Sequence, residues 1–146
     1  MELEGRFTVR APRDRVWAFF NDPNALASCL SDPHELEVVD PDHIRGWVRS
    51  GVGFVKGTFT GSATIVERVP PERARIKAHG SGMGSAVDVE ATLELSEAAG
   101  ETTVRWTADV VLGGTIASVG ARLLKGTVDK KGDEFFENAR KKLETG

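Results

Sequence analysis

Few side chains in this chain combine the residue types and the spacing that catalysis or metal binding requires. The three histidines, His34, His43 and His79, stand in a loop, at the start of one predicted strand and near the end of another. Zinc ligands recur at short, regular spacings, which these histidines lack, so we interpret them as surface or hydrogen-bonded residues. Cys29 would need an adjacent base to act as a nucleophile, and the sequence places none beside it. We interpret Cys29 as a buried structural thiol.

Two further patterns could be mistaken for functional sites. Residues 80–84 (GSGMG) are as rich in glycine as a phosphate-binding loop, but a strand follows them rather than a helix, and no Lys-Ser/Thr pair is attached. We therefore predict a turn between strands. Asp88, Glu90 and Glu94 alternate with apolar residues, which puts all three carboxylates on the solvent side of one strand. The sequence predicts no catalytic residues, no metal site and no intrinsic enzyme activity.

The composition is that of a soluble globular domain. The chain has 146 residues, 40% hydrophobic and 28% charged, and we predict a single domain over residues 1–146. A formal net charge of −3 argues against nucleic acid as a partner. One cysteine excludes a disulfide framework, no apolar run reaches 18 residues, and the first residues do not resemble a secretory signal. These features together predict a cytoplasmic protein.

Most of the chain alternates between apolar and polar residues with the period of two that is typical of half-buried strands. Proline and glycine clusters separate the alternating segments. The predicted strands cover residues 2–9, 35–39, 43–52, 55–69, 73–80, 87–95 and 104–112. Two short helices, residues 13–20 and 26–29, follow the first strand, and successive hairpins predict an antiparallel meander.

The last segment, residues 114–143, has the period of a long amphipathic helix. Its apolar stripe consists of Ile116, Val119, Leu123, Leu124, Val128, Phe135, Phe136, Ala139 and Leu143. Gly120 lies on this stripe, where a bulky residue would pack best and where a helical glycine costs about 1 kcal/mol relative to alanine. The pattern predicts an α+β fold in which a curved antiparallel sheet of about seven strands wraps around this helix, with open space beneath it.

The predicted inner face of the sheet carries many small residues on several different strands. Small residues permit either close packing of helix on sheet or a cavity, and their spread over several strands favours the cavity. We predict an apolar ligand there, in contact with Trp17, Val48, Phe59, Gly61, Ala63, Ile76, Ala78, Ala91, Trp106, Ala108, Ile116, Val119, Gly120 and Leu123.

The last helix is basic, with seven Lys/Arg against five Asp/Glu from residue 114 onward. Cations near a helix C-terminus interact favourably with the helix dipole, so an ordinary solvated face is one interpretation. The other interpretation is a surface that meets anionic lipid head groups or an acidic partner.

Several motifs spread over the whole chain resemble the family of the CoxG subunit of carbon monoxide dehydrogenase. They are residues 4–9 (EGRFTV), 11–12 (AP), 16–17 (VW), 21–23 (NDP), 26–29 (LASC), 53–61 (GFVKGTFTG), 69–71 (VPP), 113–114 (GG), 120–123 (GARL) and 134–136 (EFF). The chain departs from the family at residues 30–33 (LSDP), where the family carries an Ile-Pro-Gly loop.

This resemblance implies a helix-grip fold, like that of START lipid-transfer domains and polyketide cyclases. It also implies an accessory of a molybdenum-containing dehydrogenase, located in the cytoplasm or peripherally at the inner face of the membrane, with menaquinone as a carried ligand. Two other functions stay open: an enzyme of the cyclase or hydrolase kind, and a pure interaction subunit. The absence of tyrosine counts against the enzyme.

Overall fold

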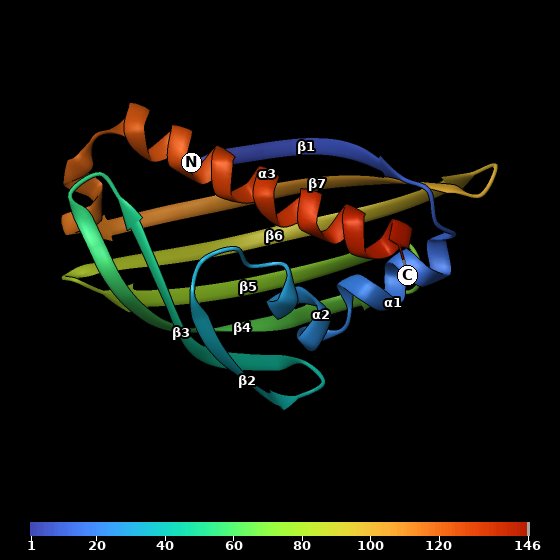
Figure 1. Cartoon of the computed structure of the whole chain (residues 1–146), viewed down its shortest axis with the longest axis horizontal. Coiled ribbons are helices and arrows are strands. Elements are labelled where there is room, and N and C mark those ends of the chain that lie inside the picture. Colours follow the sequence, from blue (N-terminus) through green and yellow to red (C-terminus); the bar gives the residue numbers. More distant parts are fainter. Residues whose placement is uncertain (146) are drawn as a thin grey trace.

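The computed structural model describes residues 1–145 and combines one sheet with helices on one of its faces (Figure 1). In chain order the elements are β1 (Glu2–Val9), α1 (Arg13–Phe20), α2 (Pro23–Ser28), β2 (His34–Asp40), β3 (His43–Val52), β4 (Val55–Val69), β5 (Arg73–Gly82), β6 (Ser85–Ala98), β7 (Glu101–Gly114), the 3₁₀ helix η1 (Thr115–Val119) and α3 (Ala121–Thr145). The α+β class and the two short helices after the first strand are confirmed.

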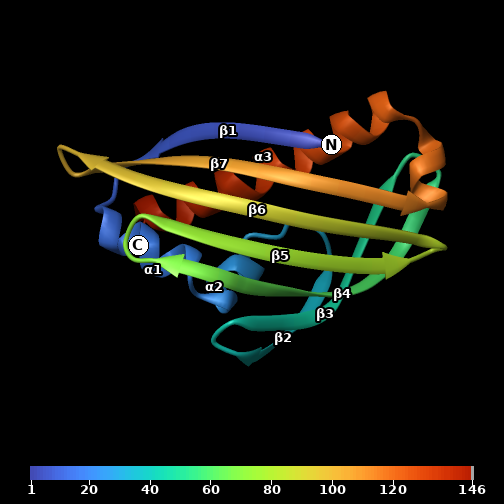
Figure 2. The same cartoon turned by 180° about the vertical axis from the view of Figure 1, so that it is seen from behind.

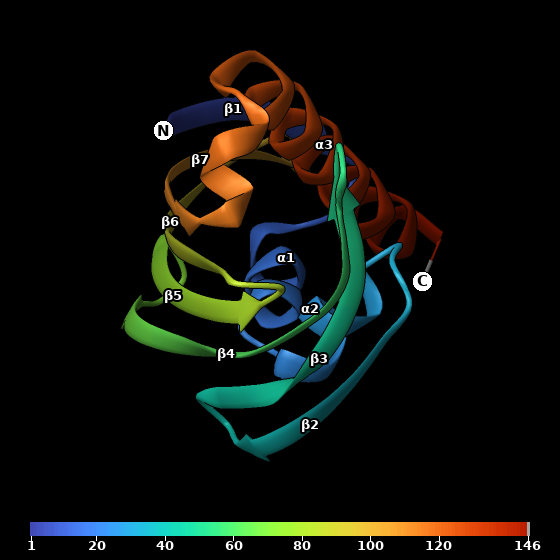
Figure 3. The ribbon, with the colours of Figure 1, turned by 90° about the vertical axis from the view of Figure 1, so that its left-hand side faces the viewer.

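The seven strands form a single antiparallel sheet in the order β1-β7-β6-β5-β4-β3-β2. Strands β2 to β7 form the predicted meander, and β1 joins it by pairing with the last strand, β7. Seen from behind, the long central strands lie side by side (Figure 2). The end view shows the sheet curling around the helices, with α3 across its open side (Figure 3). This is the predicted helix-grip arrangement.

Two tight turns join the strands at one end of the sheet. Val52 pairs with Val55 and Gly82 with Ser85, so each hairpin has a two-residue turn. Gly53 opens the first turn with φ 58°, and the second has positive φ at both Met83 (57°) and Gly84 (70°). These are the backbone angles of hairpin turns whose twist matches that of the strands. The predicted turn over residues 80–84 is therefore shorter, because β5 runs on to Gly82.

The C-terminal helix differs from the prediction at its start. Residues 115–119 form the 3₁₀ helix η1, and α3 begins only at Ala121. Gly120 separates the two with φ 112° and ψ 138°, an extended conformation at positive φ that favours glycine. The interpretation of Gly120 as a mid-helix residue is wrong. Its Cβ would meet nothing within 4 Å, and the residue is exposed, so its backbone conformation explains the glycine.

This geometry predicts opposite effects for two glycine-to-alanine substitutions. Gly120→Ala should lower the free energy of unfolding by about 1–3 kcal/mol, because alanine is strained at this φ. Gly126→Ala should raise it by about 1 kcal/mol, because Gly126 is an exposed residue in the second turn of α3 with open space around its Cβ position. Urea unfolding of both variants measures the difference. A stabilising Gly120→Ala would contradict the break in the helix.

Two separate groups of buried residues form the core, and α3 contributes to both. The first lies under the C-terminal half of α3 and contains Val9, Ala11, Val16, Phe20, Cys29, Leu93, Leu95, Val104, Ala139 and Leu143. The second lies at the start of α3 and contains Val55, Ile116 and Leu124. We call them the first and second core clusters. Because they occupy opposite ends of α3, the helix is held at both ends.

Candidate functional site

The concave face of the sheet brings together the nine strand residues predicted to contact a ligand. Residues paired directly across neighbouring strands point to the same face. Ala63 pairs with Ala78, and Val48 with Phe59. Ile76 pairs with Ala91, which in turn pairs with Ala108. The same register aligns Gly61 and Trp106 with this face. The period of two was therefore correctly interpreted on β3 to β7.

The middle of this face belongs to neither core cluster. Ile76 and Trp106 pack against the first cluster and Phe59 against the second. The six remaining residues are half-buried, although they lie on the inner side of a sheet that is covered by a helix. We call them the central inner face: Val48, Gly61, Ala63, Ala78, Ala91 and Ala108.

Helix α3 spans this region rather than packing into it. Its backbone approaches β1 on one side of the sheet and β3 near the other side, and the end view shows it bridging the two (Figure 3). Gly132 lies on the inward stripe of α3, between Val128 and Phe136 at helical spacing. It is half-buried, yet a Cβ there would meet nothing within 4 Å. The helix and the sheet thus both lack bulky side chains in the middle.

The remaining predicted ligand contacts lie outside this region. Trp17, on α1, packs against the first core cluster, and Ile116 is buried in the second, with Val119 packed against it. Leu123 is 48% exposed, whereas its neighbour Leu124 is 6% exposed and belongs to the second cluster. The predicted stripe contained both leucines: Leu124 faces inward as predicted, whereas Leu123 faces solvent and Gly120 lies before the start of α3.

Glycine and alanine on the inner face have different explanations. A Cβ on Gly61 would clash with the backbone carbonyl of His79, and one on Gly46 with that of Glu35. These glycines allow close approach of neighbouring strands in a strongly curved sheet. Close approach of the strands does not explain the alanines. We therefore attribute the space above the central inner face mainly to the small side chains of Ala63, Ala78, Ala91 and Ala108.

The thiol of Cys29 is structural, as predicted. Cys29 is 0% exposed, its Sγ donates to the Ala25 carbonyl at 3.4 Å, and burial raises the pKa of the thiol. A thiol held neutral is a poor nucleophile. The Cys29 carbonyl accepts a hydrogen bond from Asn138 Nδ2 at 2.9 Å. The hydrogen bond between Asn138 and Cys29 therefore connects α3 to the end of α2.

One polar row, on the opposite, convex face, has no counterpart among the groupings predicted by the sequence patterns. Ser62, His79 and Asp88 lie directly opposite one another on β4, β5 and β6, and His79 Nδ1 lies 2.7 Å from Asp88 Oδ1. They line a shallow groove of about 420 Å³. Serine, histidine and aspartate are the residue types that catalyse acyl transfer, but that reaction also needs hydrogen-bond donors for the developing oxyanion. The backbone N–H groups of these three strands are instead hydrogen-bonded within the sheet. Within residues 1–145 no three His, Cys, Asp or Glu side chains are grouped to hold a metal ion.

The family model for the CoxG subunit of carbon monoxide dehydrogenase matches residues 5–144, nearly the whole chain. The chain belongs to this family.

Solved structures show the fold that goes with it. A conserved protein from Geobacillus kaustophilus is 23% identical with a TM-score of 0.89, over 98% of this chain and 95% of that one. A START superfamily protein from Mycobacterium smegmatis is 10% identical with a TM-score of 0.73, over 98% and 97% of the two chains. These similarities show a START-like helix-grip fold. No curated protein matches the chain.

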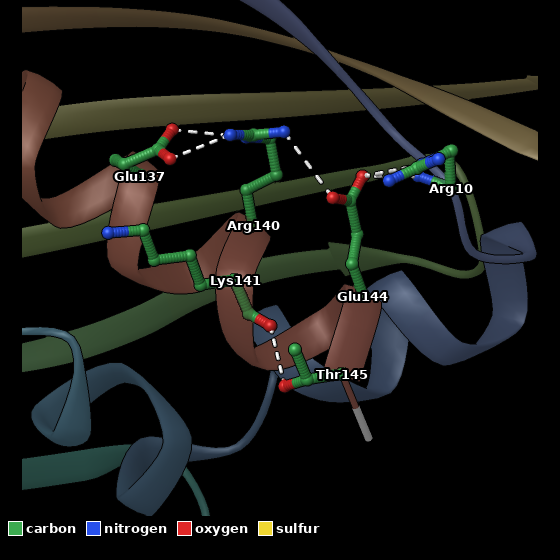
Figure 4. Close-up of polar contacts among 6 residues, drawn as sticks. All are labelled: Arg10, Glu137, Arg140, Lys141, Glu144 and Thr145. Atoms are coloured by element: carbon green, nitrogen blue, oxygen red, sulfur yellow. Dashed lines mark hydrogen bonds and ion pairs between the residues drawn. The ribbon is translucent and has the colours of Figure 1, made fainter.

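The cations of this CoxG-family helix are in part paired with acids of the same chain. Arg140 donates from Nη2 to Glu137 at 2.6 Å and from Nη1 to Glu144 at 3.3 Å, and the Glu144 carboxylate also accepts from the Arg10 backbone N–H at 2.9 Å (Figure 4). The hydrogen bond from Arg140 lowers the pKa of Glu137. These contacts attach the C-terminal end of α3 to the end of β1. None of the helices in residues 1–145 is both long and apolar enough to cross a membrane.

Asp32, in the loop between α2 and β2, connects α3 to β3. Its Oδ2 accepts from Lys131 Nζ at 2.7 Å and from Ser50 Oγ at 2.9 Å. Burial acts to raise the pKa of Asp32, but the hydrogen bonds from Lys131 and Ser50 outweigh it, so that the pKa is lowered. The carboxylate therefore stabilises the fold in its ionised form.

We predict a pH-dependent effect of Asp32→Asn. A carboxyl group whose pKa is lowered by folding contributes its full stability above the unfolded value of about 3.9, and loses it as the pH falls towards the lower folded value. Asp32→Asn should therefore lower the free energy of unfolding at pH 7 by up to about 1 kcal/mol, and by progressively less below pH ~4. Urea titrations at several pH values measure this. Asp129→Asn, which removes the exposed pair with Lys125, is the control with a smaller expected effect.

Proposed function

We propose that this protein is a non-catalytic binding protein that holds a hydrophobic ligand between the central inner face and α3. The observation that carries the proposal is that the six residues of the central inner face are half-buried although they lie beneath a helix. Protein interiors normally pack as densely as organic crystals. An apolar ligand would complete the packing that the protein's own side chains leave incomplete.

The expected ligand is long and apolar. Helix α3 has 25 residues, about 37 Å at 1.5 Å per residue, and the two core clusters occupy only its ends. Each Å² of apolar surface removed from water contributes about 25 cal/mol, so a lipid or isoprenoid chain along this face would gain substantial binding energy. A quinone, menaquinone in particular, is the ligand that the family suggests.

Family membership also supports a partner. A CoxG-family protein is expected to serve a molybdenum-containing dehydrogenase of the carbon monoxide dehydrogenase type. A carrier that shields an apolar quinone from water could deliver it to such an enzyme, or recruit the enzyme to the membrane where quinones reside. Both roles require binding rather than catalysis, which agrees with a central inner face made of glycine, alanine and valine side chains.

The test is to ask what the purified protein carries. Native mass spectrometry, followed by organic extraction and chromatography, should find a quinone or lipid bound to the protein in stoichiometric amount. Protein stripped of its ligand should take up menaquinone from detergent, with a higher melting temperature as a result. A protein that purifies without a ligand and takes up neither menaquinone nor phospholipid would contradict the proposal and favour a pure interaction subunit.

A further inference from the structure

Three large apolar side chains are exposed to solvent at one end of the molecule. Phe54 is 71% exposed in the β3–β4 turn, Met83 is 51% exposed in the β5–β6 turn, and Leu123 is 48% exposed in the first turn of α3. Both turns and the start of α3 lie at the same end of the sheet, remote from α1 and the C-terminus (Figures 1 and 2). We call these three residues the apolar tip.

Contacts across the β3–β4 hairpin join these residues into one surface. Leu123 and Val119 lie 3.0 and 3.1 Å from the position of a Cβ on Gly53, next to Phe54. On the neighbouring strand, the sulfur of Met83 lies 2.5 Å from the position of a Cβ on Gly57. The hairpin is thus flanked by α3 on one side and by Met83 on the other.

The charged residues closest to the tip are basic. The two turns and the start of α3 with their flanking residues, 52–58, 81–86 and 113–126, contain Lys56, Arg122 and Lys125 and no aspartate or glutamate, although the whole chain has a net charge of −3. Asp88, Asp109 and Asp129 lie just beyond these segments. Lys125 pairs with Asp129, one turn further along α3, and is still 60% exposed. Exposed apolar groups beside basic residues are typical of surfaces that bind anionic membranes.

Two features of the tip are unfavourable in water. Met83 has φ 57°, where asparagine or glycine is preferred in such turns. The first turn of α3 carries Arg122 and no acid, although the positive end of a helix dipole favours acidic residues. The acyl-chain layer of a bilayer would bury the Met83 side chain. Lipid phosphates would neutralise the positive charge of Arg122 and the positive end of the helix dipole. Features that cost stability in water are expected where the structure serves another role.

We propose that the apolar tip docks on an anionic lipid bilayer, with Phe54, Met83 and Leu123 entering the interface and the surrounding cations contacting the phosphates. This inference rests on the proposed function in one respect, because docking would bring the second core cluster, which contains Val55 and Leu124 directly behind the tip, close to the source of an apolar ligand. A bilayer fits better than a protein partner, because the side chains project from two turns and a helix start and the charged residues closest to them are basic.

The experiment measures binding of the 146-residue chain to vesicles. Flotation with vesicles of mixed phosphatidylglycerol and phosphatidylcholine should recover the protein, and vesicles of phosphatidylcholine alone should recover much less. Each neutralised cation, Lys56→Gln or Arg122→Gln, should weaken binding about fivefold, and Phe54→Ser should weaken it further. The matched control is Lys141→Gln with Lys142→Gln, which removes two exposed cations from the other end of α3 and should leave binding unchanged.

Two readouts separate docking from a structural role. Met83→Asn suits the backbone angle better, so it should bind vesicles more weakly while its melting temperature stays equal or rises. Phe54→Trp should gain fluorescence that brominated phosphatidylglycerol quenches, beyond any quenching of the native tryptophans in the wild type.

Equal binding to neutral vesicles, or loss of binding in the Lys141/Lys142 control alone, would overturn the proposal. If the protein bound to no vesicles at all, the proposal would also be overturned. A protein partner would then be the remaining explanation for the exposed apolar residues at this end. A protein that binds vesicles but carries no apolar ligand would defeat the proposed function and leave tip docking intact. A protein that carries an apolar ligand but does not bind vesicles would overturn tip docking and support the proposed function.

Discussion

Replacing Phe136 with alanine is expected to lower the free energy of unfolding by about 3–5 kcal/mol. The Phe136 ring stacks on Trp106 with centroids 4.9 Å apart, and it contacts Phe7 and Phe135 at 5.3 Å and Phe20 at 6.4 Å. Through these rings one residue of α3 is attached to β1, β7 and α1. Aromatic pairs of this kind contribute beyond the apolar area that they bury.

A loss of this size is a large part of the roughly 5–15 kcal/mol that stabilises a typical domain. Denaturant unfolding followed by far-UV circular dichroism measures it. Phe54→Ala is the matched control, because the same side chain is removed from a position that is 71% exposed, and its effect should stay within about 0.5 kcal/mol. Equal effects of the two substitutions would show that α3 is not held through Phe136.

Replacing Gly132 with leucine is expected to separate ligand binding from stability. Leucine has a helix propensity about 1 kcal/mol better than glycine, and a Cβ at position 132 meets nothing within 4 Å. The free energy of unfolding should therefore rise. Four added carbons at about 0.8 kcal/mol each would displace ligand contacts worth about 3 kcal/mol, which corresponds to roughly a hundredfold loss of affinity.

Gly126→Leu provides the control for this test. It makes the same change on the exposed side of α3, so it should raise stability without altering affinity. Fluorescence titration with anilinonaphthalene sulfonate, and competition by menaquinone, report affinity in both variants. A Gly132→Leu protein that unfolds more easily than the wild type would mean that helix and sheet already touch, because overpacking costs about 1–3 kcal/mol.

Local sequence patterns determined most of the secondary structure. The bounds of β1, α1, β3 and β4 agree with the prediction, and those of the other strands differ by a few residues at their ends. Alternation is informative in this chain because one face of the sheet is shielded and the other meets water. The same alternation placed the strand residues of the candidate site, Ala63 and Ala78 among them, on one face before any pairing was known.

Tertiary structure decided the rest, and α3 shows why. A helical stripe extrapolated from residue 114 assumes one continuous helix, but Gly120, at positive φ, separates η1 from α3. Leu124 is buried as the stripe predicted, but Leu123, which the stripe also contained, is 48% exposed, and Gly120 lies outside the helix.

The row of Ser62, His79 and Asp88 and the grouping of Phe54, Met83 and Leu123 were likewise invisible in the sequence. The members of the row are 17 and 9 residues apart along the chain, and only the strand register aligns them. Alternation and helical period report which side of an element meets water, because they record the local environment of each residue. They carry no information about which elements become neighbours, since that depends on contacts between distant segments.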